Sequence, residues 1–352
     1  MPRLIARWLT RRYFPVLICV TLVQMFATGR PQAAPVLDPT DRIRLAEFYR
    51  LNRVLGDSCW PGWTTAPDAV LLVCDSVEFL IHHPAPSTDF ESLGYDSLLE
   101  GDVLWRPRKF PSNLLATFPA IDATPTIVIG RAEKTDSKTS TPWVTTLAHE
   151  HFHQWQMTQS WYRAALDSLD LSGGDKTGMW MLNFPFPYDS DSVAGKFGDL
   201  CQRLTRMAHT RDLDSLRTAL RAYLTEREQF RNALAPAEFR YFSFQVWQEG
   251  FSRYMEWRVA DLAASRYKPT KAFRALPDYE PFSTLARGLS QSSLKELSTQ
   301  KLPDSRRVCF YSFGATEAMI LARLMPDWSS QYGPERFRVE RLLEMGLQRT
   351  QR

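Results

Sequence analysis

The feature that most constrains the fold of this chain is the pentapeptide His149-Glu150-His151-Phe152-His153, which reads H-E-x-x-H. Residues four apart in an α-helix lie about 40° from each other around the axis, so two imidazoles at this spacing can reach one metal ion from the same face. A strand-like segment, 126–129, precedes the pentapeptide, and Pro142 suits the first turn of a helix that continues to residue 159. The sequence therefore predicts a strand followed by a metal-binding helix.

The residue types at this spacing favour zinc. Zinc in a hydrolytic site usually takes three protein ligands and leaves a fourth position for water. His149 and His153 would supply two nitrogens, and Glu150 would act as general base on the water. His151 lies roughly 200° from His149 around the helix, so it cannot ligate the same ion and is expected in the core or behind the ligands. The alternative is an exposed helix face of His and Glu that binds no metal.

A second segment carries a glutamate in a related context. Residues 247–256 read Trp-Gln-Glu-Gly-Phe-Ser-Arg-Tyr-Met-Glu. With the H-E-x-x-H helix, this segment resembles the gluzincin branch of the zincin metallopeptidases, the thermolysin-like group, in which a glutamate on a second helix completes the metal site. The match is to an E-G-x-x-x-Y-x-E signature of several bacterial members. The resemblance implies that Glu249 is the third ligand and that the fold is zincin-like.

Two neighbours of Glu249 affect this assignment. Thermolysin-like enzymes place an aspartate four residues after the ligand glutamate to hold a metal-bound histidine, and this chain has Arg253 there. Other groups are therefore expected to orient His149 and His153. Glu256 is the rival third ligand, because seven residues along a helix bring it within about 20° of Glu249. Without a metal, these side chains would form ion pairs on a solvated helix face.

A hydrolase also needs a donor for the oxyanion that forms during attack on a carbonyl. Tyr311 is the candidate, because it precedes a predicted helix and could be brought over the site. His209 is a second candidate for moving a proton, and a structural role is the alternative for both residues. Tyr254 lies about 140° from Glu249 on the helix, which is unfavourable for a direct role. Arg253 could instead bind a substrate carboxylate.

The periodicity of apolar residues predicts an α+β fold with a small sheet packed on the metal-binding helix. Three parts are expected: a signal peptide and linker (1–34), an α/β part that contains the H-E-x-x-H helix (35–160), and a mainly helical part that carries the third ligand (161–352). Strands are expected at 69–74, 77–81, 103–105, 114–118 and 126–129. Helices are expected at 41–55, 142–159, 161–169, 193–208, 213–234, 236–264, 316–324 and 334–347.

The first 34 residues have the layout of a secretory signal peptide, with five arginines, no acidic residue and an apolar run at 13–27. The run is shorter than the roughly 20 residues that span a bilayer, which favours a cleaved signal peptide. An uncleaved membrane anchor is the alternative. A periplasmic or secreted location is expected. The leader holds five of the 43 Lys and Arg residues and none of the 39 Asp and Glu residues. The remainder is nearly neutral, which does not indicate a nucleic-acid partner.

Four cysteines lie outside the leader, an even number in a chain predicted to reach an oxidising compartment. The favoured pairing is Cys59–Cys74 with Cys201–Cys309, because the first pair flanks a predicted turn region and closes a short loop. Four free thiols are the alternative.

Together these observations predict an exported zinc metallopeptidase, a hydrolase that binds one zinc ion through His149, His153 and Glu249 and cleaves peptide or protein substrates. Glu150 would activate the water and Tyr311 would assist. An extended peptide would lie along an edge strand of the sheet. The alternative is a catalytically inactive zincin-like protein that binds a component of the cell envelope. Zinc-dependent hydrolysis of a non-peptide amide or ester is a third possibility.

Overall fold

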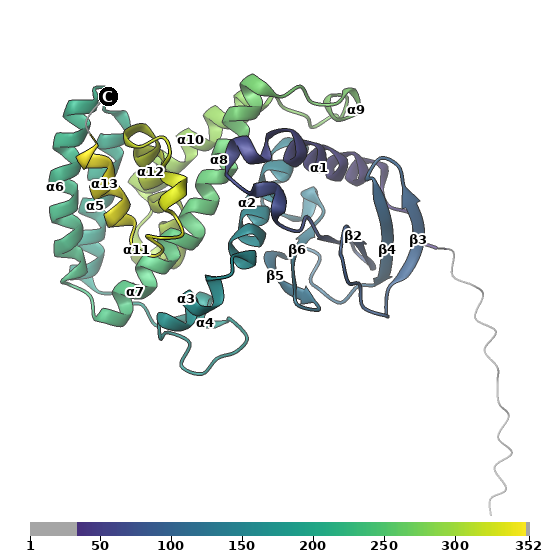
Figure 1. Cartoon of the computed structure of the whole chain (residues 1–352), viewed down its shortest axis with the longest axis horizontal. Helices are drawn as coiled ribbons and strands as arrows, with labels where there is room; N and C mark the ends of the chain where they lie inside the picture. The colour runs from purple at the N-terminus through teal and green to yellow at the C-terminus, as the bar shows by residue number, and fades with distance from the viewer. Residues whose placement is uncertain (1–33, 350–352) are drawn as a thin grey trace, which may run out of the picture. The chain divides into compact units, whose positions relative to one another are not determined.

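In the part of the chain that the structure describes, the strands all lie between Val70 and Gly130, and helices make up most of the rest (Figure 1). The structure is a computed structural model that describes residues 34–349, so the predicted signal peptide lies outside the described residues apart from its last position. From Pro35 onward the chain forms one compact unit. The predicted α+β class is confirmed at the level of a mixed sheet combined with many helices.

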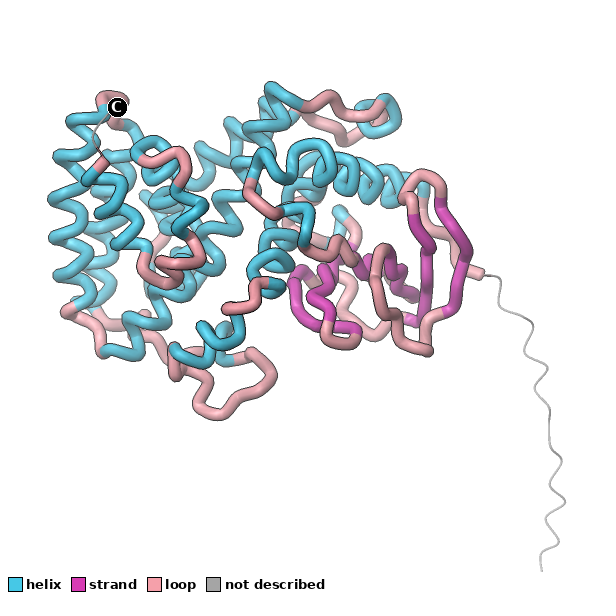
Figure 2. The backbone as a smooth tube through the Cα atoms, in the orientation of Figure 1, coloured by secondary structure: helices cyan, strands magenta, loops and turns pink. Residues whose placement is uncertain are grey.

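The sheet has six strands in the order β3-β4-β2-β1-β6-β5. Their bounds are β1 Val70–Val73, β2 Val77–Ile81, β3 Glu91–Asp96, β4 Gly101–Pro107, β5 Leu115–Ile121 and β6 Thr124–Gly130. Only β1 and β6 pair in parallel, and the other neighbours are antiparallel. Figure 2 shows these strands gathered on one side of the helices. The five predicted strands are confirmed, whereas β3 was not predicted because its exposed, polar residues do not alternate with apolar ones.

The sheet is buried on both faces, which explains the continuous apolar run in β1. Successive side chains of a strand point to opposite faces. Val70 and Leu72 belong to the main core beneath the helices, whereas Leu71 and Val73 belong to a smaller apolar cluster on the other face.

The helices cover the main-core side of the sheet and then continue away from it. Helix α1 (Pro39–Cys59) is capped by Asp38, whose carboxylate accepts from the backbone N–H groups of Thr40 and Asp41. Helix α2 (Ser140–Thr158) packs against α1, β5 and β6. The later helices are α3 Tyr162–Ser168, α4 Trp180–Asn183, α5 Asp191–His209, α6 Leu213–Arg231, α7 Pro236–Gln245, α8 Phe251–Arg266, α9 Lys271–Arg274, α10 Phe282–Thr299, α11 Leu302–Ser305, α12 Cys309–Leu324 and α13 Val339–Gln348.

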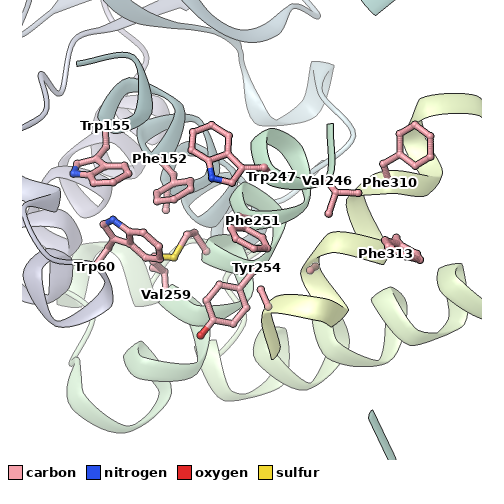
Figure 3. Close-up of a cluster of buried hydrophobic side chains, with 14 of the residues drawn as sticks. Trp60, Phe152, Trp155, Val246, Trp247, Phe251, Tyr254, Val259, Phe310 and Phe313 are labelled. Carbon is pink, nitrogen blue, oxygen red and sulfur yellow. The ribbon is translucent and has the colours of Figure 1, made fainter. Parts of the chain in front are cut away.

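Helices α7 and α8 are joined without a break by a π-helical turn, Val246–Gly250. The following helix, α8, packs against α2, α10 and α12. Figure 3 shows the buried aromatic side chains around this helix, among them Trp60, Phe152, Trp247 and Phe251. The tryptophans near the H-E-x-x-H motif in sequence, Trp143 and Trp155, are buried as well, so core packing accounts for them.

The structure does not contain the predicted disulfides, because Cys59, Cys74, Cys201 and Cys309 are all free thiols. Burial raises the pKa of Cys59 and of Cys74 to about 12, so both remain protonated at neutral pH. Instead of closing a loop, these two side chains pack as partly buried groups against the main core.

Among residues 34–349, no helix combines the length and the apolar character that crossing a bilayer requires.

Candidate metal centre

Helix α2 holds the H-E-x-x-H motif in a fixed position between the sheet and the helices. At its first turn, Asp278 accepts from the backbone N–H of Ser140 at 2.9 Å and from its hydroxyl at 2.6 Å. The indole N–H of Trp143 donates to the carbonyl oxygen of Gly130 at 3.0 Å, which ties the helix to the end of β6. These contacts fix the position of α2 along its axis and its rotation about that axis. The fold therefore sets the positions of its histidines.

The structure brings His149, His153 and Glu249 together, as predicted from the sequence. Oε2 of Glu249 lies 3.9 Å from Nε2 of His149 and 3.5 Å from Nε2 of His153. The two imidazole rings are 5.0 Å apart, centroid to centroid. Each of the three side chains offers one ligand atom, and these three atoms lie within 4.8 Å of one another. The group could therefore hold a metal ion.

The spacing of the three atoms suits a small tetrahedral ion. Bonds of 2.0–2.1 Å in a tetrahedron place neighbouring ligand atoms roughly 3.3 Å apart. The separations of 3.5 and 3.9 Å are close to that value. Two imidazole nitrogens and one carboxylate oxygen also form a donor set that zinc accepts, with one position left for water. The residues present thus fit the metal that the motif implies.

Polar side chains surround Nδ1 of His153. Its Nδ1 lies 2.7 Å from Oε1 of Gln156. The amide group of Gln156 is itself oriented, because its NH2 donates to the hydroxyl of Tyr332 at 2.6 Å and to the carbonyl of Gln248 at 3.3 Å. The oxygen of Gln156 is thus placed to accept a proton from Nδ1, and the amide nitrogen of Gln248 lies 3.0 Å from the same Nδ1. When His153 is neutral with its proton on Nδ1, the lone pair of Nε2 is available to a metal ion.

His149 has a carboxylate at its other ring nitrogen. Oε2 of Glu256 lies 3.9 Å from Nδ1 of His149 and accepts from Nη1 of Arg253 at 3.0 Å. Glu256 therefore does not join the three-atom group that includes Glu249. Glu256 was the rival candidate for the third ligand, but it lies on the side of His149 that faces away from Glu249.

The π-helical turn places Glu249 at the centre. Such turns are rare and occur mostly as single insertions within α-helices, often at functional sites. Gly250, the last residue of the turn, has no side chain between the helix and α12: a Cβ atom there would lie 2.5 Å from Cα of Gly314. The close approach of these two glycines brings α12, with Tyr311 in its first turn, next to Glu249.

Tyr311 lies beside the metal group, although the structure corrects its predicted position ahead of a helix. Its ring is nearly parallel to that of His149 at a centroid distance of 6.2 Å. Its hydroxyl accepts from Nη1 of Arg307 at 2.9 Å. Burial and the charge of Glu249 raise the pKa of Tyr311 well above its ordinary value, against the opposing charge of Arg307. The phenol is therefore a proton donor at neutral pH.

Glu150 is held by the edge strand of the sheet. Its Oε2 accepts from the hydroxyl of Thr117 in β5 at 2.8 Å, and the same hydroxyl is 3.0 Å from its backbone carbonyl. Glu150 directly follows His149 in α2, and its charge is one of the causes that raise the pKa of His153. Sequence reasoning did not identify Thr117, because nothing in the strand distinguishes this threonine before the sheet is assembled.

The electrostatics of the metal-free group follow from the proximity of its charges. Burial lowers the pKa of His153, but the charge and hydrogen bond of Glu249, the charge of Glu150 and the hydrogen bond of Gln156 together outweigh burial and raise the pKa to about 9. For Glu249, burial raises the pKa, but the charges of His153 and His149 and their hydrogen bonds together outweigh burial, so the pKa falls well below its ordinary value. In the metal-free protein the centre is therefore an ion pair, and a metal ion would have to displace a proton from it.

Three further sequence candidates do not join the group. His151 is fully buried on another face of α2, between the carbonyl of Trp63 and the side chain of Gln154. His209 ends α5 as an exposed residue and has no contact with the metal group among the described residues. Tyr254 lines a cavity of about 560 Å³ that none of the metal-group residues line.

Comparisons of the chain with models of protein families, with curated proteins and with solved structures found no significant match.

Proposed function

We propose that this protein is a zinc metallopeptidase of the gluzincin type, with a zincin-like arrangement of its sheet and α2. The observation that carries the proposal is the convergence of Nε2 of His149, Nε2 of His153 and a carboxylate oxygen of Glu249 from two helices. The contact between Nδ1 of His153 and Gln156 supports it, because hydrogen bonds behind a ligand orient that ligand for metal binding.

When bound, zinc supplies a Lewis acid that polarises the scissile carbonyl and lowers the pKa of a water molecule to about 7. Glu150 takes the proton from the attacking water and delivers it to the leaving amine. The hydroxyl of Thr117 donates a hydrogen bond to Oε2 of Glu150, so Oε1 remains free to accept a proton from the water. The hydroxyl of Tyr311 donates a hydrogen bond to the oxyanion, and Arg307 holds that hydroxyl in place.

The substrate peptide lies along β5. This strand is at the edge of the sheet and pairs on one side only, with β6, so its other side can accept a peptide as an added strand. Thr117 belongs to β5 and binds Glu150, which joins the peptide-binding edge to the general base. We also propose that the protein acts after export, in the periplasm or outside the cell.

The test combines metal content with the Glu150→Gln substitution. Purified wild-type protein is expected to contain one zinc ion per chain by mass spectrometry and to cleave unfolded protein substrates. The Gln variant retains the hydrogen bond from Thr117, so it is expected to keep its zinc and to lose at least about 100-fold in hydrolysis. Glu228→Gln on the exposed surface of α6 is the matched control and is expected to change neither property.

Full activity in the Gln variant, or wild-type protein without zinc, would contradict the proposal. Zinc-loaded wild-type protein that binds peptides and cleaves none would favour the alternative, a zincin-like binding protein without catalysis.

A further inference from the structure

Two arginines flank the metal group on the side of α8 and α12. Arg253 follows Glu249 by four residues in α8, and Arg307 lies in the short 3-10 turn Arg306–Val308 that leads into α12. Nη1 of Arg253 is bonded to Glu256, which faces Nδ1 of His149. Nη1 of Arg307 is bonded to Tyr311, whose ring is nearly parallel to that of His149 at a centroid distance of 6.2 Å. Each guanidinium is thus one side chain away from His149.

Both guanidinium groups have donors to spare. An arginine carries five N–H donors. Arg307 is half-buried and forms no ion pair with any carboxylate in residues 34–349. Arg253 pairs only with Glu256, its Nε is buried without a partner, and 30% of its side chain remains exposed. The charge of Arg307, which has no carboxylate partner among the described residues, and the remaining donors of Arg253 are therefore suited to bind an anion that arrives with the substrate.

The planar guanidinium group is matched to a carboxylate, which it can bind through two parallel hydrogen bonds. The groups that contact each arginine argue for the same ligand. Glu256 accepts one hydrogen bond from Arg253, which leaves other donors of that guanidinium free, and the only side-chain hydrogen-bond partner that the described residues give Arg307 is the phenol of Tyr311. A peptide offers a carboxylate either at its C-terminus or on an acidic side chain.

We propose that Arg253 and Arg307 bind a substrate carboxylate close to the scissile bond. The protein then selects peptides that present a free C-terminal carboxylate, or an Asp or Glu side chain, next to the bond that is cleaved. This inference rests on the proposed peptidase function, since it assigns a substrate preference to the same site.

The experiment measures peptide binding without hydrolysis. Zinc-loaded Glu150→Gln protein is immobilised and exposed to equal amounts of a casein digest and of the same digest methyl-esterified with an isotope label, which blocks every carboxyl group. Mass spectrometry then compares the free and the esterified form of each retained peptide. We expect the free form to be retained about 10- to 100-fold more tightly, the range for a hydrogen bond to a charged group. Peptides without Asp or Glu report on the C-terminus, and amidated synthetic peptides with one internal Asp report on side chains.

A second substitution connects the preference to the arginines. Adding Arg307→Gln to the Glu150→Gln protein is expected to remove most of the preference for free carboxylates. Arg306→Gln is the matched control, because Arg306 is the adjacent, exposed residue and pairs with Asp189 instead. Arg253→Lys keeps a cation beside Glu256 but loses the planar guanidinium group that can form two parallel hydrogen bonds. It is therefore expected to weaken the preference in part. In cleavage assays with Glu150 intact, Arg307→Gln is expected to lower kcat for all peptides, because Arg307 also holds the hydroxyl of Tyr311, and in addition to raise KM for free-acid peptides and not for amides. If Arg307 only positioned Tyr311, kcat would fall and KM would not distinguish the two kinds of peptide.

Equal retention of free and esterified peptides, or no retention of either, would overturn this inference. So would a preference that survives Arg307→Gln unchanged. The proposed function fails by a different result: a zinc-loaded wild-type protein that retains free-acid peptides selectively and cleaves none of them. Cleavage of free and esterified peptides at equal rates would leave the peptidase proposal standing and remove the carboxylate preference.

Discussion

Gly250 and Gly314 meet where α12 crosses the π-helical turn, so closely that a Cβ atom on Gly314 would lie 2.6 Å from the carbonyl oxygen of Val246 and 2.8 Å from Cα of Gly250. No side chain fits between the two backbones at this point. The metal ligand Glu249 precedes one glycine, and Tyr311 lies one helical turn before the other. The contact therefore sets the distance between the third ligand and the phenol.

The first prediction concerns this contact. Gly314→Ala is expected to push α12 away from the turn and to lower the free energy of unfolding by about 1–3 kcal/mol, the range for overpacking a core. Metal affinity should fall as well, because Glu249 moves with the turn. Chemical denaturation and metal titration measure the two effects. Gly288→Ala in α10 is the control: a Cβ atom there meets nothing, so stability should rise by up to about 1 kcal/mol.

The second prediction separates Glu249, in the π-helical turn, from Glu256, in α8. Glu249→Gln is expected to abolish stoichiometric metal binding, because it removes the only carboxylate that faces Nε2 of both histidines. Glu256→Gln is expected to keep the metal with an affinity about 10- to 100-fold lower, since it removes only a group behind His149. Competition with a chromophoric chelator measures both affinities. The reverse order of losses would show that Glu256 is the ligand.

The third prediction concerns the general base. Thr117→Val removes the hydroxyl that holds Oε2 of Glu150 and nearly preserves the shape of the side chain. Metal content is expected to stay the same, while kcat falls by about tenfold, because the carboxylate is no longer fixed for proton transfer. Steady-state kinetics with matched metal analysis provides the measurement. A loss of metal together with activity would mean that Thr117 supports the fold of the centre and not its base.

The fourth prediction is a pH dependence of metal binding. The pKa of His153 in the metal-free protein is about 9, compared with an ordinary value of 6.5, and a bound metal requires the neutral imidazole. Below pH 9 a proton competes with the metal, so the apparent affinity should rise by up to about tenfold per pH unit as pH increases towards 9. Calorimetry in buffers of different ionisation enthalpy should detect the released proton. An affinity that is flat between pH 7 and 9 would contradict this ion-pair description.

The raised pKa of His153 also predicts how the stability of the metal-free protein depends on pH. A raised pKa stabilises the folded, metal-free protein fully below 6.5, and this contribution is lost as pH rises through about 9. The metal-free protein is therefore expected to melt at progressively lower temperature over that interval. The metal-loaded protein should not show this component, because its His153 carries no proton at Nε2. Substitution of the exposed His209 is the control and should leave the difference unchanged.

The parts of the site that depend on local spacing could be predicted from the sequence. His149 and His153 share a helix face because the helical repeat fixes their angle, and His151 is excluded for the same reason. The assignment of Glu249 needed the resemblance of its surroundings to a family signature. Its place in a π-helical turn was not predictable, since that turn depends on how the glycines of two distant segments pack.

The misplaced features all depend on tertiary packing. Helical angle put Glu256 on the same face as Glu249, but seven residues also separate them by about 10.5 Å along the axis, so Glu256 reaches the far nitrogen of His149. The start of α12 was predicted too late, because Gly314 reads as a helix breaker until its contact with Gly250 is known. The pairing of Cys59 with Cys74 rested on loop length, which carries no information about where the thiols point.

Helix α7, the π-helical turn and α8 form one continuous helical rod from Pro236 to Arg266. Within this rod the π-helical turn shifts the direction in which side chains point. One extra residue in a turn rotates everything before it by about 100° relative to an unbroken α-helix. The two halves of the rod can therefore present buried faces in different directions, one toward the segment around Met181 and the other toward α2. Deleting a single residue here would bring the halves back into register and misdirect one of those faces. Length in this part of the chain is consequently as constrained as residue identity, and insertions or deletions should be tolerated far less well here than at either end of the rod.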